Sequence, residues 1–100
     1  MPRATLHVEA GPAAGSTVEI ENEPLLIGRG PGRESPGALG GDPELSREHA
    51  RITVADGTAT IEDLGSTNGT FVNGKQLDRP RRLTPGDVVR VGGTDLRYDG

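Results

Sequence analysis

One short stretch limits what this chain can fold into more than any other: residues 65–74, which read Gly-Ser-Thr-Asn-Gly-Thr-Phe-Val-Asn-Gly. It holds two Asn-Gly pairs, and Asn-Gly is the strongest short-range signal for a tight turn with positive φ. Between the pairs lies the β-prone triplet Thr70-Phe71-Val72. The backbone is therefore predicted to bend sharply, run as a short strand and bend again. Ser66, Thr67 and Asn68 would be held at the first bend, in the kind of loop that carries binding residues on rigid scaffolds.

The rest of the chain also has β character. Apolar and polar residues alternate over 6–10 and 17–21, a short apolar run covers 25–27, and β-prone segments flank Asp56-Gly57. Further strands are expected at 75–77, 88–91 and 94–98, and the Pro and Gly of 84–86 stand where a type II turn requires them. No ten-residue segment has helical apolar spacing. About ten short strands separated by turn signals indicate an all-β sandwich or barrel.

Size and composition narrow the class of protein. One hundred residues predict a single domain spanning 1–100, with its core at about 5–98. The absence of cysteine excludes disulfides and thiolate metal sites, and His7 and His49 alone are too few for a metal. A formal net charge of −4 argues against a general nucleic-acid binder. With neither a bilayer-spanning apolar run nor a leader, a cytoplasmic protein without membrane insertion is expected.

Two segments have no strand pattern. Residues 28–45 are rich in glycine and proline, and long loops of this kind are either functional or disordered. Arginines and acids balance between residues 28 and 51, so positive potential there depends on how Arg29 and Arg47 are aimed. The second segment carries Arg79, Arg81 and Arg82 around Pro80. It is predicted to be an exposed loop, with a second contact surface as the alternative.

Three polar clusters fall at predicted turns: Arg29, the segment 45–49, and the segment 66–68. A phosphate monoester carries about −1.5 to −2 charge and three acceptor oxygens. Arg29 offers a planar fork of donors that can bond two of those oxygens. Ser46 and Thr67 can add hydroxyl donors, while Asn68 can hold a peptide backbone through its donor and acceptor. These are the parts of an anion site.

Four motifs in this order and spacing resemble the signature of the forkhead-associated (FHA) domain: Gly28-Arg29, Ser46-Arg47-Glu48-His49, Ser66-Thr67-Asn68-Gly69-Thr70 and Val72-Asn73-Gly74. The resemblance extends from about Thr5 to Tyr98. It implies an eleven-stranded β-sandwich whose loops at one end bind phosphothreonine peptides.

The resemblance also implies a role for each position. Arg29 and Ser46 would contact the phosphate, and Thr67 would support that loop, with a phosphate contact of its own as an alternative. Arg47 would reach either the phosphate or the peptide backbone. Asn68 would bond the backbone just after the phosphothreonine.

Three further residues would support the site: Gly28, His49 and Gly69. His49 would tie the loops together by hydrogen bonds, and Gly69 would supply the turn. The expected function is a phosphothreonine-dependent module that recruits or regulates proteins phosphorylated by Ser/Thr kinases. Its partner would be a phosphorylated protein or its own parent chain, and no cofactor is expected. A small pocket for the γ-methyl would favour phosphothreonine over phosphoserine.

Two other functions are alternatives to phosphothreonine binding. A phosphate-independent interaction or oligomerisation module would keep the sandwich and use another face. A hydrolase could use Ser46 and His49 with an aspartate, but the Gly-x-Ser-x-Gly elbow is missing. The glycines from Gly28 to Gly32 lack the following helix and the Lys-Ser/Thr pair of a nucleotide loop. The chain is therefore predicted not to be an enzyme.

Overall fold

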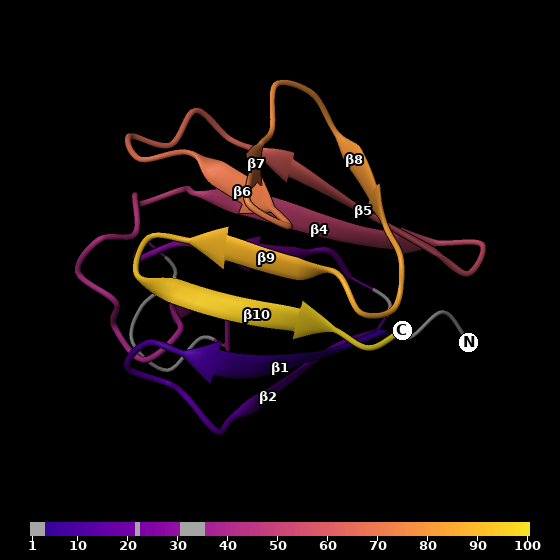
Figure 1. Ribbon diagram of the computed structural model, residues 1–100, viewed down its shortest axis with the longest axis horizontal. Coiled ribbons are helices and arrows are strands. Elements are labelled where there is room, and N and C mark those ends of the chain that lie inside the picture. Colours follow the sequence, from indigo (N-terminus) through magenta and orange to yellow (C-terminus); the bar gives the residue numbers. More distant parts are fainter. Residues whose placement is uncertain (1–3, 22, 31–35) are drawn as a thin grey trace.

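The computed structural model describes residues 4–21, 23–30 and 36–100 and shows two antiparallel sheets packed face to face (Figure 1). The six-stranded sheet has the order β2-β1-β10-β9-β6-β7, and the four-stranded sheet has the order β3-β4-β5-β8. A 3₁₀ turn, η1, covers Pro36–Ala38. The strands are β1 (Ala4–Ala10), β2 (Thr17–Ile20), β3 (Leu25–Ile27), β4 (Ala50–Ala55), β5 (Thr58–Asp63), β6 (Thr70–Val72), β7 (Lys75–Gln76), β8 (Arg81–Leu83), β9 (Val88–Val91) and β10 (Thr94–Tyr98).

One hydrophobic core fills the space between the sheets. Because side chains alternate along a strand, Leu6 and Val8 of β1 face inward, while His7 between them is only half-buried. Ile52 and Ile61 sit opposite each other on β4 and β5 and are fully buried. The all-β sandwich predicted from the alternation is therefore confirmed. In the described residues it has ten strands, one fewer than the resemblance implied.

Local turn chemistry explains how the strands are joined. Asp56-Gly57 and Asn73-Gly74 both have positive φ at both residues, which is the type I′ geometry of two-residue hairpins. Gly86 has φ 96°, and Asp87 N donates to Thr84 O at 3.0 Å, as in the predicted type II turn. At residues 68–69, by contrast, only the glycine has positive φ. That pair closes no hairpin, since it lies where the chain crosses from β5 in one sheet to β6 in the other.

The segment after Pro80 differs from its prediction. Arg81–Leu83 forms strand β8, which pairs with β5, where an exposed loop was expected. Leu83 is buried in the core, whereas Arg82 is exposed. A three-residue strand with one apolar side chain has no alternation to detect, and its conformation comes from pairing with β5.

The connections at one end of the sandwich come together. In Figure 1 the segments 36–49 and 64–69 and the β9–β10 turn lie at the end opposite the chain termini. The described part of the long glycine-rich loop is well packed, with Ala38, Leu39 and Leu45 buried. Residues 31–35 of that loop lie outside the described residues. Within the described ranges, no helix has the length and apolar character needed to cross a bilayer.

Candidate functional site

Arg29 stands two residues after the end of β3 and is hydrogen-bonded to the segment before β4. Its backbone N–H donates to Ser46 O at 3.1 Å, and its side-chain Nε donates to Leu45 O at 2.6 Å. The side chain is exposed, and the described residues provide no hydrogen-bond partner for its terminal nitrogens Nη1 and Nη2. The guanidinium is thus held by one nitrogen, while two others stay available for an anion.

Thr67 and Asn68 contact the same segment from the other side. Thr67 N donates to Ser46 Oγ at 2.9 Å, and Asn68 Nδ2 donates to Glu44 O at 3.1 Å. Because Ser46 Oγ accepts this bond, its own hydrogen remains to be donated elsewhere. The structure therefore brings Arg29, Ser46, Thr67 and Asn68 together, from three connections that are distant in the sequence.

His49 is buried and connects these loops through hydrogen bonds. Its side chain has no solvent exposure, and Ser46 N donates to Nδ1 at 3.1 Å. An N–H group can only donate, so Nδ1 accepts and Nε2 carries the ring hydrogen. Nε2 donates to Gly69 O at 2.8 Å. The neutral imidazole thus joins the Ser46 loop to the Gly69 turn, and both of its nitrogens are occupied by the backbone.

Asp63, at the end of β5, holds the 64–69 connection in shape. Its Oδ2 accepts from the backbone N–H groups of Gly65 and Ser66 at 3.0 and 3.1 Å. Its Oδ1 accepts from the Ser66 hydroxyl and from Thr70 Oγ1 at 2.7 Å, and Ser66 Oγ in turn accepts from Gly69 N at 2.9 Å. Burial raises the pKa of Asp63, but these hydrogen bonds outweigh burial and leave the pKa below 3.8.

Asp42 fixes the segment that carries Glu44 and Ser46. It is 1% exposed, and its Oδ2 accepts from Gly93 N at 2.8 Å and from Thr94 Oγ1 at 2.7 Å. Its Oδ1 accepts from Glu44 N at 2.9 Å. The β9–β10 turn, which belongs to the six-stranded sheet, is thereby fastened to the loop that enters β4.

Gly28 allows Arg29 to approach the Ser46 loop. A Cβ atom at Gly28 would lie 2.2 Å from Arg47 O, a backbone atom that cannot move aside cheaply. Gly30 N also donates to Arg47 O at 2.9 Å, so the two segments run in close contact. The Arg47 side chain is exposed and, with Leu26, Gly30 and Glu48, borders a shallow hollow beside the loops.

The described binding loops carry two arginines outside any ion pair, although the chain as a whole is acidic. Within the part of the chain that the structure describes, neither Arg29 nor Arg47 forms an ion pair with a carboxylate. Arg51, in contrast, pairs with Glu62 and is neutralised. Arg29 and Arg47 are therefore left to interact with an anion, and their share in the local potential stays a prediction.

Sequence reasoning did not single out Asp63 and Asp42. Each accepts from backbone N–H groups two or three residues further on, the pattern of an Asx turn. An aspartate shortly before Gly65 at a strand end was the available signal for Asp63. No local signal connects Asp42 with Gly93, because 51 residues separate the two partners.

An arginine fork, a hydroxyl and a carboxamide gathered by the loops at one end of a β-sandwich form the arrangement expected of a module that recognises phosphorylated peptides. The family model for the FHA domain matches residues 25–92, and this chain belongs to the FHA family. The family resemblance noted in the sequence is thereby confirmed.

The relatives agree with this assignment. The FHA domain-containing protein FhaB of Mycolicibacterium smegmatis is 34% identical over 89% of this chain and 56% of its own length. The crystal structure of an FHA domain from Chlamydia trachomatis superposes with a TM-score of 0.86 at 30% identity, covering 98% of this chain and 97% of that one. An FHA structure solved in a study of phosphothreonine-dependent interactions gives a TM-score of 0.80 at 30% identity, covering 98% and 96%. The chain spans about half the length of FhaB.

Proposed function

We propose that this chain is a phosphothreonine-dependent peptide-binding module that recruits or regulates proteins phosphorylated by Ser/Thr kinases. One observation carries the proposal: Arg29 and Asn68 both bond the backbone of the segment 44–46, which carries Ser46, and all three side chains keep further polar groups available. The relative studied for phosphothreonine-dependent interactions supports the same ligand class. The ligand is a phosphorylated partner protein or the parent chain itself, and the site needs no cofactor.

Each residue would contribute a different kind of contact. The Nη1 and Nη2 groups of Arg29 would bond two phosphate oxygens, and the Ser46 hydroxyl would donate to a phosphate oxygen while it accepts from Thr67 N. Asn68 uses one Nδ2 hydrogen on Glu44 O, so its Oδ1 and second Nδ2 hydrogen would bond the peptide backbone. Arg47 would reach the phosphate or the peptide backbone from the rim of the site.

Hydrogen bonding at Ser46 and His49 supports binding without catalysis. A serine nucleophile needs a base within hydrogen-bond reach of its hydroxyl. Here Ser46 Oγ accepts from Thr67 N, while both nitrogens of His49 are occupied by Ser46 N and Gly69 O. We place the module in the cytoplasm, where protein kinases and their ATP are found.

Replacing the arginine fork tests the proposal. An oriented phosphothreonine peptide library selects a binding sequence, which is then titrated calorimetrically against the wild-type chain and Arg29→Ala. Charge-assisted hydrogen bonds contribute about 1.5–3 kcal/mol each, so losing two should weaken binding by at least about a hundredfold. Arg90→Ala, an exposed arginine on the outer face of the six-stranded sheet, is the matched control and should bind like wild type.

Two outcomes would contradict the proposal. One is equal affinity of the Arg29→Ala and wild-type chains for the phosphopeptide at unchanged thermal stability. The other is equal affinity of the wild-type chain for the phosphorylated and unphosphorylated peptides, which would favour a phosphate-independent interaction module. A peptide pair with phosphothreonine and phosphoserine measures the expected preference for the γ-methyl.

A further inference from the structure

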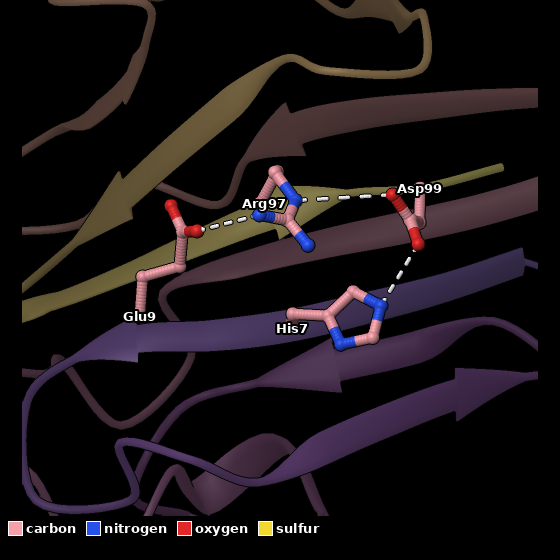
Figure 2. Close-up of polar contacts among 4 residues, drawn as sticks. All are labelled: His7, Glu9, Arg97 and Asp99. Carbon is pink, nitrogen blue, oxygen red and sulfur yellow. Dashed lines mark hydrogen bonds and ion pairs between the residues drawn. The ribbon is translucent and has the colours of Figure 1, made fainter.

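The described cations without an ion pair fall into two groups. The first is Arg29 and Arg47 at the binding loops, and the second is Lys75, Arg81 and Arg82 on β7 and β8. The other described arginines, Arg51, Arg79, Arg90 and Arg97, each form an ion pair with a carboxylate. Figure 2 shows Arg97 between Glu9 and Asp99 on the outer face of the six-stranded sheet, with His7 also bonded to Asp99. In the second group, Lys75 and Arg82 therefore stand out as positive charge that the described fold leaves unpaired.

Residues 75–82 line a groove of about 450 Å³. This stretch, here called the basic groove, contains four basic residues and one acid, a net charge of +3 in a chain whose total is −4. Asp78 pairs with Arg79 at 3.4 Å, with both side chains 81% exposed, so water screens that pair. Arg81 feels the charge of Asp87, whereas the exposed Lys75 and Arg82 have no such partner in the described residues.

The backbone of an edge strand beside the basic groove is also free to bond a peptide. β7 ends the six-stranded sheet and β8 ends the four-stranded sheet, so the connection 77–80 spans the open side of the sandwich between two sheet edges. β8 pairs only with β5 among the described strands. An edge strand presents unpaired N–H and C=O groups to an extended peptide, which can add to the sheet as a further strand.

We propose that the basic groove is a second binding surface that takes an extended acidic peptide segment, independently of phosphothreonine. The occupant follows from charge complementarity: carboxylates would pair with Lys75 and Arg82, while the peptide backbone bonds the free edge of β8. Charged residues also protect sheet edges from unwanted pairing. That purely protective role predicts no peptide binding at all, so the two explanations are separable.

The test uses a fluorescently labelled peptide in which Glu alternates with Val, without phosphothreonine, and the full chain. The double variant Lys75→Gln/Arg82→Gln removes two unpaired charges, and Arg90→Gln/Arg97→Gln removes two paired ones as the matched control. Fluorescence anisotropy should show affinity falling about tenfold in the first variant and less than about twofold in the control. Raising the ionic strength from about 0.05 M to about 0.5 M should weaken wild-type binding.

Amide resonances locate the contact. Those of residues 75–83 should shift on addition of the acidic peptide, while those of Arg29, Ser46 and Asn68 stay in place. The groove variant should still bind the phosphothreonine peptide like wild type, which shows that it is folded. The proposal is overturned if no acidic peptide binds, or if both double variants lose affinity equally. It is also overturned if single-stranded DNA or phosphatidylserine vesicles bind as tightly as the peptide, or if only a second copy of the chain occupies the groove.

Discussion

At the scale of single residues, His49 shows how one buried side chain can organise a binding surface. It has no solvent exposure and joins Ser46 N to Gly69 O, so its contribution is positional. In His49→Ala, two backbone groups lose their partner and a cavity forms, and the free energy of unfolding should fall by about 2–5 kcal/mol. Urea denaturation measures this, with the half-exposed His7→Ala expected within about 0.5 kcal/mol of wild type. Similar losses for the two variants would contradict the assigned role.

Gly28 is a second position where one added atom should change both stability and binding. Gly28→Ala would place a Cβ 2.2 Å from Arg47 O, so either the loop moves or the strand end does. We expect a loss of about 1–3 kcal/mol in the free energy of unfolding and weaker phosphopeptide binding. Gly57→Ala is the control, because that glycine also has positive φ but has open space around it. If the cost were backbone strain alone, Gly57→Ala would be equally harmful.

At the scale of elements, the connection between β5 and β6 owes its shape to Asp63. Asp63→Asn replaces one acceptor oxygen by an NH₂ group facing N–H or hydroxyl donors, so the loop that carries Thr67 and Asn68 should loosen. The free energy of unfolding should fall by about 1–3 kcal/mol, and phosphopeptide affinity should fall with it. Calorimetry on Asp63→Asn and on the exposed turn variant Asp56→Asn separates this from a general effect of removing charge. An unaltered affinity would show that the carboxylate does not shape the loop.

The elements also show which parts of this structure can be predicted from sequence. The hairpin turns at Asp56-Gly57 and Asn73-Gly74 were predictable because positive φ at Asn, Asp and Gly is a local property. The three loop clusters were predictable because each lies in a connection only a few residues from a strand end. Strand β8 was not predictable, because three residues are too few to show a period. The hydrogen bond from Gly93 N to Asp42 was also not predictable, because its partners meet only after both sheets have formed.

At the scale of the whole molecule, two carboxylates link stability to pH. Burial raises the pKa of Asp87, but hydrogen bonds from Thr84 and Asn73 and the charge of Arg81 outweigh burial, so the pKa falls below 3.8, as at Asp63. A carboxylate whose pKa is lower in the folded chain stabilises the fold above its unfolded pKa and loses that contribution as pH falls through the folded value. The free energy of unfolding should therefore decrease steeply below about pH 4.

Chemical denaturation across pH checks this expectation. The double variant Asp63→Asn/Asp87→Asn should be less stable at neutral pH but should lose less stability on acidification than wild type. Asp56→Asn, which replaces an exposed carboxylate, should follow the wild-type curve. Parallel curves for the double variant and wild type would contradict the assignment.

The connection at residues 64–69 joins the two sheets as well as carrying part of the site. The chain leaves the four-stranded sheet at Asp63 and enters the six-stranded sheet at Thr70. The loop that carries Asn68 is therefore also a covalent link between the two sheets. A displacement of this loop by a bound peptide would therefore reach the end of a strand in each of the two sheets.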